Sequence, residues 1–493
     1  MPLQDIIEII VYDYMWGTPL IIIILLSGLY LTIKTGFFQF THFGVAIKKS
    51  LANLLGKGDK KGKEGDSGVV SALEAVSIAI GTTVGVGNIG GVASAIALGG
   101  PGAVFWMWVS GLIGMIIKMV EITLALHYRD KSEGGENFGG PNYYISRGLG
   151  KENNKKLLSK ILSALFTFGF IIGLFINIQT YTASEAIAST FNFDILPVAI
   201  FYTIALYLLI GGGIKRIGKV AVYMVPFMCL FYLAGGIFII FKNIDQLPAT
   251  FRMIFADAFT GTAALGGFAG ASFKLAITTG MARSVFSNEA GWGSSPMTHA
   301  SARVNHPVKQ GLLGIFEVFV DTVIICTITA TIIIITGQWS SGLDGADLTL
   351  SAFQTGMGDI GRIILSVGVF LFALTTSTGL FIQIGVVLRY MLGDSPLKHK
   401  LMEFYKWFYP IPSLGLVVIA VVYEMPGSAV WLLSDSATAL PIFANIITLI
   451  LLVPKFLELL NDYKARYLGK GQVNKNFQVF YEGSNEENQV DSH

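Results

Sequence analysis

The chain has 493 residues, of which 53% are hydrophobic and only 13% are charged. Soluble domains carry roughly a quarter charged residues, so this composition excludes a soluble globular protein and indicates one that crosses a membrane many times. The formal net charge of +2 gives no basis for nucleic-acid binding.

Apolar segments long enough to cross a membrane recur along the whole chain. A transmembrane helix needs about 20 mostly apolar residues. About eleven segments meet this criterion: 18–33, 69–98, 102–127, 160–189, 195–211, 218–241, 260–286, 309–336, 360–388, 408–423 and 429–454. Lys and Arg gather in alternate loops, beginning with the loop at 34–68. Because cytoplasmic loops are enriched in Lys and Arg, we expect a multi-pass protein of the cell membrane with an external N-terminus and a cytoplasmic C-terminal tail, disordered after Asn474.

The sequence GVGNIG at residues 85–90 has the G-x-G-x-x-G spacing of dinucleotide-binding turns. Such a turn requires a short preceding strand and an acidic residue about 20 positions later, and the sequence has neither. The glycines instead fall in the middle of the second apolar segment, where they would interrupt a helix. Transporters use such interruptions as binding sites, because half-helix N–H groups attract an anion and unwound carbonyls coordinate a cation. Close helix packing through glycine is the alternative interpretation.

A second interruption is predicted at Gly280, within FKLAITTGMARSVFSNEAGWGSSP. The two interrupted segments lie five predicted spans apart, and AITTG echoes AIGTTVG in the first. When the first span is set aside, ten spans remain, and each interruption lies in the first span of a group of five. Because five is odd, the second group enters the membrane from the opposite side to the first, so the two groups have opposite orientation. We therefore predict an all-α integral membrane protein with inverted repeats at 69–241 and 242–454. Residues 1–68 would form an external N-terminus, an additional helix and a cytoplasmic linker, and 455–493 a cytoplasmic tail.

Two long motifs, GTTVGVGNIGGVASAIALGGPGAVFWMW and SVFSNEAGWGSSPMTHASA, resemble the signatures of the alanine or glycine:cation symporter family. The resemblance spans roughly residues 70 to 450. It implies a ten-helix core of the leucine-transporter type, with broken first and sixth core helices and one additional helix. It also implies a transporter rather than an enzyme, which takes up alanine or glycine with sodium, or sometimes protons. The partners would be the amino acid and the surrounding membrane lipid, with no nucleic acid or obligate protein partner.

The same resemblance implies a sodium site. VGVGN matches the unwound first core helix, which would supply the backbone carbonyls of Gly81 and Val84. FALTTSTG matches the eighth core helix, which would supply the carbonyl of Ala373 and the hydroxyls of Thr376 and Ser377; a shift of one residue would bring in Thr375. Oxygen ligands suit a hard cation, and hydrogen bonding between helices is the alternative role of these hydroxyls.

The resemblance implies substrate ligands from the first and sixth core helices, and residue types and spacing add candidates in the third. The N–H groups of Val86 and Gly87 would bind the substrate carboxylate, with the side chains of Thr83 and Asn88 within reach. The sixth core helix would line the pocket with Phe273, Ile277, Thr278 and Thr279. In the third, Asn177 and Tyr181 are four residues apart and would share a helix face, with Gln179 off it. Amides at this depth either bind a zwitterion or hold helices together.

Several charged residues within the apolar segments admit more than one role. Lys118 and Glu121 are predicted to form a local ion pair, and Lys274 is left outside the site. Glu74, Glu317 and Asp321 could relay protons, which leaves proton-coupled symport as an alternative function. An intramembrane aspartyl protease is a further alternative, since GMGD occurs at 356–359 and YD at 12–13. That chemistry needs two carboxylates side by side within the membrane, whereas Asp13 and Asp359 both precede apolar segments.

Overall fold

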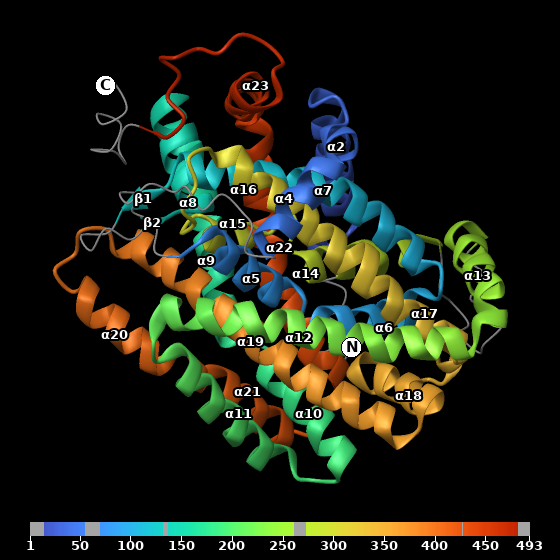
Figure 1. The fold of residues 1–493 in the computed structure, drawn as a ribbon. Coiled ribbons are helices and arrows are strands. Elements are labelled where there is room, and N and C mark those ends of the chain that lie inside the picture. The colour runs from blue at the N-terminus through green and yellow to red at the C-terminus, as the bar shows by residue number, and fades with distance from the viewer. Residues whose placement is uncertain (1–13, 55–69, 132–136, 261–272, 426, 482–493) are drawn as a thin grey trace.

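The computed structural model describes residues 14–54, 70–131, 137–260, 273–425 and 427–481, and these residues are almost entirely helical. The helices pack into one bundle, in which α13 (Leu247–Thr260) and α20 (Lys398–Phe408) lie at opposite edges (Figure 1). A short antiparallel hairpin, β1 (Asp130–Lys131) with β2 (Asn137–Phe138), lies at one end of the bundle. The prediction of an all-α membrane protein is confirmed.

The N-terminal part of the bundle contains the first predicted repeat. Before it come α2 (Thr18–Lys34), α3 (Phe38–Thr41) and α4 (Phe43–Leu54). The repeat itself comprises α5 (Ala72–Thr83), η2 (Gly87–Gly91), α6 (Val92–Gly99), α7 (Ala103–His127), α8 (Pro141–Tyr144), η3 (Ile145–Glu152), α9 (Lys156–Phe175), α10 (Gln179–Phe191), α11 (Ile195–Ile210) and α12 (Gly213–Lys242).

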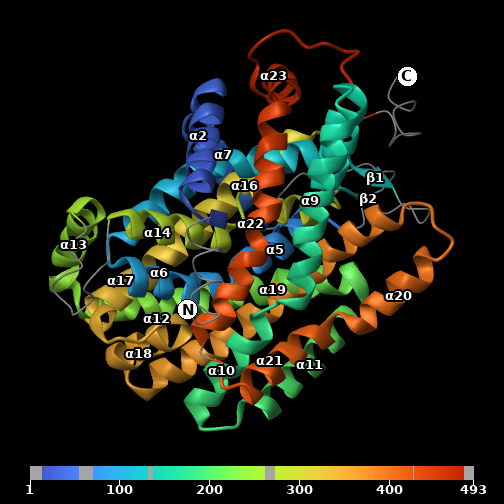
Figure 2. The ribbon, with the colours of Figure 1, turned by 180° about the vertical axis from the view of Figure 1, so that it is seen from behind.

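The C-terminal part contains the second predicted repeat and a final amphipathic helix. Its elements are η4 (Ile244–Gln246), α13, α14 (Phe273–Asn288), α15 (Ser295–His299), α16 (Pro307–Val318), η6 (Phe319–Cys326), α17 (Thr327–Ile335), η7 (Gln338–Ser340), α18 (Gly345–Met357), α19 (Asp359–Leu392), α20, α21 (Pro410–Val422), α22 (Gly427–Leu451) and α23 (Val453–Leu468). α9 of the first repeat packs along α22 of the second (Figure 2).

By length and composition, six described helical segments can cross a membrane, or up to eight when each of two bent pairs counts as one span. α2 and α11 are shorter apolar helices. Each predicted span overlaps a described helix, although part of the span predicted at 260–286 lies outside the described residues. The number of spans and the boundaries of the repeats remain predictions.

The first predicted interruption is present. α5 ends at Thr83, Val84 has an extended backbone, and the helix resumes at η2, so that its two halves meet at 41°. The other end of α5 is capped, because the Ser71 hydroxyl accepts from the Glu74 N–H and the Glu74 carboxylate accepts from the Ser71 N–H. Glu74, a candidate proton carrier from sequence, thus has a local structural role.

The second interruption is not at Gly280, and that prediction is wrong. α14 runs unbroken from Phe273 to Asn288. A side chain at Gly280 would place its Cβ 2.3 Å from the Ala103 carbonyl oxygen, so this glycine allows α14 to pack closely on α7. The chain leaves the helix after Asn288, where Glu289, Gly291 and Gly293 all have positive φ, and resumes at α15.

The third core helix has an interruption that the sequence analysis missed. α9 ends at Phe175 and α10 begins at Gln179, so Asn177 lies between two helices. The side-chain oxygen of Asn177 accepts from the Gln179 N–H, at 3.2 Å, and its amide nitrogen donates to the Tyr409 hydroxyl, at 3.3 Å. Asn177 and Tyr181 therefore do not share the continuous helix face that was predicted.

The segment after α23 is ordered as far as Tyr481, which corrects the expectation of disorder for residues 475–481. The Tyr481 N–H donates to the His127 carbonyl at 2.9 Å, and His127 Nδ1 lies 2.8 Å from the Val479 carbonyl oxygen. The guanidinium of Arg129 stacks over the Phe480 ring. Residues 479–481 are therefore held against the C-terminal end of α7. Residues beyond 481 lie outside the described part of the chain.

Candidate ion and substrate site

A small cavity lies where the two interrupted helices meet in the middle of the bundle. Its volume is only about 20 Å³, which is room for about one or two water molecules. Phe286 and the Ser287 backbone lie against Gly87, so that the end of α14 touches the interruption between α5 and η2. The cavity is lined by Thr82, Thr83, Gly85, Val86, Gly87, Gln179, Phe286, Glu289, Trp292, Thr376 and Leu380.

Part of the sodium site implied by the family resemblance comes together at one end of this cavity. The hydroxyl of Thr376, on α19, lies 3.3 Å from the carbonyl oxygen of Gly81 and 3.1 Å from that of Thr82. Gly85 leaves room for it, because a Cβ there would lie 2.3 Å from Thr376 Oγ1. Val84 and Ala373 are fully buried in the two segments that meet here.

The two neighbouring hydroxyls on α19 are directed elsewhere. Ser377 Oγ is 2.8 Å from the Tyr202 hydroxyl of α11, and the Ser377 carbonyl accepts from Tyr409 at 2.6 Å. The Thr375 hydroxyl donates to the Phe372 carbonyl of its own helix at 2.9 Å. Of the three candidate hydroxyls, the structure thus brings Thr376 to the carbonyls in the last turn of α5.

The predicted substrate residues of the first core helix divide into two groups. Thr83, Val86 and Gly87 line the cavity. Asn88 does not: its Oδ1 accepts from the Gly85 N–H at 2.8 Å, and its Nδ2 donates to the Asp321 carboxylate at 2.6 Å. Asn88 therefore braces the interrupted backbone rather than facing the cavity.

Asp321 is the centre of a fully buried polar cluster beside both interruptions. Besides Asn88, its carboxylate accepts from the Ser287 hydroxyl, at 3.0 Å, and from the Thr322 hydroxyl, at 2.8 Å. This cluster joins η2 to α14 and η6. The sequence singled out Asp321 as a titratable acid but not as a partner of Asn88, because the two residues are 233 positions apart.

The predicted pocket residues of α14 do not reach the cavity. Phe273 is 44% exposed, and the hydroxyls of Thr278 and Thr279 donate to carbonyls of their own helix. Neither these residues nor Ile277 line the cavity. Phe286 takes that place, about two to four turns further along the helix, because the interruption follows Asn288 rather than Gly280. The glycine pair in EAGWGSS was the sequence signal that could have located it.

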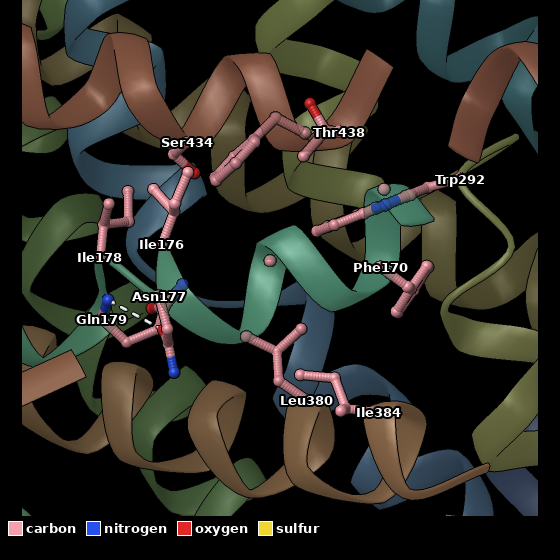
Figure 3. A pocket seen from close by; sticks show the side chains of 13 residues that line it. Phe170, Ile176, Asn177, Ile178, Gln179, Trp292, Leu380, Ile384, Ser434 and Thr438 are labelled. Atoms are coloured by element: carbon pink, nitrogen blue, oxygen red, sulfur yellow. Dashed lines mark hydrogen bonds between the residues drawn. The ribbon is translucent and has the colours of Figure 1, made fainter. Parts of the chain in front are cut away.

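The third core helix contributes residues at its own interruption. Gln179 lines the cavity, and Asn177 lines a second cavity of about 40 Å³ next to it. Tyr181 lines neither; its hydroxyl donates to the Glu185 carboxylate at 2.9 Å. Leu380 and Ile384 of α19 border one side of the second cavity, and Ser434 and Thr438 of α22 border the other (Figure 3).

A buried ion network supports the interruption of the sixth core helix. The predicted pair of Lys118 with Glu121 is replaced by a pair of Lys118 with Glu317, at 3.2 Å. Glu317 is also held by Ser295 at 2.7 Å and His299 at 3.0 Å. Glu121 accepts from the Gly291 N–H at 3.2 Å and from the Asn445 amide. Glu317 and Glu121 therefore anchor the segment that carries Glu289 and Trp292.

Comparison with known proteins agrees with this architecture. A model of the sodium:alanine symporter family matches residues 2–478. The chain is 37% identical to an uncharacterized transporter (YflA) of Bacillus subtilis, over 92% of each chain. It is 34% identical to the sodium/alanine symporter AgcS of Methanococcus maripaludis, over 90% of this chain and 93% of AgcS.

Solved structures show the fold. MhsT in complex with L-phenylalanine matches with a TM-score of 0.56 at 14% identity, over 78% of this chain and 89% of MhsT. A sodium-coupled sialic acid symporter in a substrate-bound outward-open state matches with a TM-score of 0.51 at 16% identity, over 88% and 93%.

These matches establish the leucine-transporter-type fold and a multi-pass membrane transporter, and they exclude the aspartyl protease. The conclusion rests on the family match over nearly the whole chain, together with the interrupted helices found where transporters bind their substrates. The chain belongs to the sodium:alanine symporter family.

Proposed function

We propose that this transporter takes up a small neutral amino acid, alanine or glycine, together with sodium by alternating access. The observation that carries the proposal is the contact of the Thr376 hydroxyl with the carbonyls of Gly81 and Thr82, in the last turn of α5 before the interruption. A cation held by these oxygens would join α5 to α19 without any charged ligand. The name of the relative AgcS, a sodium/alanine symporter, supports the same ion and substrate.

The amino acid would bind beside the cation, in the small cavity bordered by the two interruptions. Its carboxylate would face Val86 and Gly87, where the second half-helix begins and its dipole favours an anion. Phe286 and Trp292 border the remaining space, which suits a small apolar side chain. Each sodium ion moving inward gains about 2.3 kcal/mol per 100 mV, enough for about a 50-fold gradient of a neutral substrate.

A proton-coupled symporter is the second candidate, and Asp321 is the observation that favours it. Its fully buried carboxylate contacts Asn88 and Ser287 beside both interruptions, and ionisable groups at such depth in membrane proteins commonly serve transport. In either version we infer an external N-terminus and a cytoplasmic tail from the distribution of Lys and Arg.

Uptake of labelled alanine into proteoliposomes tests the proposal. We expect accumulation above equilibrium with an inward sodium gradient and none when potassium replaces sodium at equal pH. Thr376→Ala should weaken the sodium dependence, whereas Thr378→Ala, which removes a buried hydroxyl bonded within the same helix, should not. Equal accumulation in both buffers, abolished by a proton ionophore, would favour protons, and alanine that only equilibrates would contradict coupled transport.

A further inference from the structure

The last described residues of the chain lie against the end of α7, and their contacts continue to the start of α5. The segment after α23 crosses to the end of the bundle where β1 and β2 lie (Figure 1 and Figure 2). Three of its residues contact residues 127–129, at the C-terminal end of α7. These three, which we call the tail latch, are Val479, Phe480 and Tyr481. They lie beyond the part of the chain that the family model matches.

Backbone and ring contacts hold the tail latch in place. The Tyr481 N–H donates to the His127 carbonyl at 2.9 Å, and the Tyr481 ring lies 5.5 Å from the Tyr128 ring. The Phe480 ring covers the guanidinium of Arg129, with 4.4 Å between Cζ and the ring centroid. Arg129 is only 5% exposed. Because a cation is attracted more strongly to an aromatic face when water is excluded, Phe480 helps to keep this buried guanidinium in position.

Arg129 connects the tail latch to the first core helix. Its Nη1 donates to the Ala302 carbonyl at 3.0 Å, and Ala302 pairs with Val70 in a parallel bridge. The Arg303 N–H donates to the Val70 carbonyl at 3.3 Å. Val70 and Ala302 are buried and pack with Ala75 in a small apolar cluster. Since α5 begins two residues after Val70, these contacts hold the start of α5 against the rest of the bundle.

The position of α5 gives this connection a consequence for transport. The start of α5 lies on the side that the distribution of Lys and Arg predicts to be cytoplasmic. Its other end carries the Gly81 and Thr82 carbonyls that contact Thr376 at the proposed cation site. Every residue from Ala75 to Thr83 is buried. Helix α5 therefore has to separate from its neighbours before water on that side reaches the site, and such relative movement is the basis of alternating access.

We propose that the tail latch is a clamp on the cytoplasmic side, which holds the start of α5 in place and slows the opening of the site toward the cytoplasm. The inference rests on the proposed function, since it assumes alternating access. The three latch residues are only partly buried, and surface segments with little burial open at the smallest free-energy cost. Release of the latch therefore precedes the movement of α5, and a transporter without the latch opens inward more readily.

Phe480 and Ser77 provide the variants that test the latch. Phe480→Leu keeps an apolar side chain but removes the aromatic face over Arg129, whereas the matched control Phe480→Tyr keeps that face. Ser77, on α5, is 1% exposed, and its hydroxyl has no hydrogen bond within the described part of the chain. Ser77→Cys is therefore a conservative reporter of the separation of α5. The same chains without Ser77→Cys give the background labelling of Cys229 and Cys326.

The experiment measures how fast a membrane-impermeant maleimide labels Ser77→Cys in inside-out membrane vesicles, without sodium or alanine. We expect slow labelling in the Ser77→Cys parent and in Phe480→Tyr. Labelling should be about 2- to 30-fold faster in Phe480→Leu, the range that corresponds to the loss of one cation–π contact. A chain that ends at Gln478, and so lacks the whole latch, should be labelled at least as fast as Phe480→Leu.

The outcomes separate this inference from the proposed function, because labelling requires neither ion nor substrate. If Phe480→Leu and the chain ending at Gln478 are labelled no faster than the parent, while wild type accumulates alanine with sodium, the latch is overturned alone. Faster labelling of Ser77→Cys in a protein that only equilibrates alanine would leave the latch and contradict coupled transport. Faster labelling of Cys326 in Phe480→Leu would indicate a general loosening of the fold and would also overturn the latch.

Discussion

Gly85 gives the sharpest test of the proposed cation site, because Thr376 packs against this glycine. In Gly85→Ala the new Cβ would lie 2.3 Å from Thr376 Oγ1, closer than any tolerated contact. Thr376 must then rotate away from the Gly81 and Thr82 carbonyls, or α5 and α19 must separate. Overpacking of this kind costs about 1–3 kcal/mol, which corresponds to about a 5- to 150-fold loss of apparent sodium affinity.

The assay is the sodium activation of alanine uptake in proteoliposomes, measured for Gly85→Ala, Thr376→Ala and the double variant. The same Cβ would be 3.4 Å from Thr376 Cβ, an ordinary contact, so truncating Thr376 removes the clash. We therefore expect the double variant to resemble Thr376→Ala alone, as neighbouring residues that share one interaction are non-additive. Wild-type sodium activation in Gly85→Ala, or strictly additive effects, would refute the assignment of Thr376.

Three further predictions concern the surrounding network and His306, at the start of α16. Asp321→Ala leaves the donors of Asn88, Ser287 and Thr322 unpaired. It should therefore lower the free energy of unfolding by more than about 3 kcal/mol. Asp321→Asn keeps an acceptor, so thermal unfolding should show a clearly smaller loss of stability. Lys118→Met leaves the buried Glu317 without its cation and should lower the free energy of unfolding by about 3–5 kcal/mol. The double variant Lys118→Met/Glu317→Gln should recover most of this stability. No recovery would contradict the pairing of Lys118 with Glu317. Burial lowers the pKa of His306, which lies outside the spans, to about 4 despite its hydrogen bond to Asp462. The unfolded chain, with a His pKa near 6.5, binds more protons below that pH, so stability should fall from pH 6.5 to pH 4, with a shallower slope in His306→Gln.

The first interruption was predictable because its cause is local. The glycines at 85, 87, 90 and 91 weaken the helix wherever they lie, and their position in the middle of an apolar segment indicates a binding site. Their partner Thr376 was found only through the family resemblance, since nothing in the sequence shows which α19 hydroxyl faces α5. In the structure Thr376 fits against Gly85, which has no Cβ to obstruct the Thr376 hydroxyl.

The other two interruptions depend on tertiary contacts that sequence patterns do not record. The sequence alone does not distinguish the roles of Gly280 and Gly291. Gly280 lies within a helix and packs against the Ala103 carbonyl, whereas Gly291 lies outside a helix and has a positive φ. The break at residues 176–178 contains neither glycine nor proline. Asn177 lies in the break, where its side chain bonds to the Gln179 N–H and to the Tyr409 hydroxyl, 232 residues away.

The position of Asn88 suggests how ion and substrate binding would be linked. Its side chain ties the Gly85 N–H, within the unwound segment, to Asp321 on η6. The Gly81 and Thr82 carbonyls, on the other side of the same segment, contact Thr376 on α19. A cation that strengthens the contact of Thr376 with α5 would fix the unwound backbone between α19 on one side and Asp321 on the other. That backbone carries Val86 and Gly87, which border the substrate cavity. Sodium would therefore increase amino-acid affinity by ordering the peptide groups that bind the carboxylate, and the amino acid would increase sodium affinity by the same factor. If Asn88→Ala leaves both affinities measurable but uncouples them, this short segment is the physical link between the two sites.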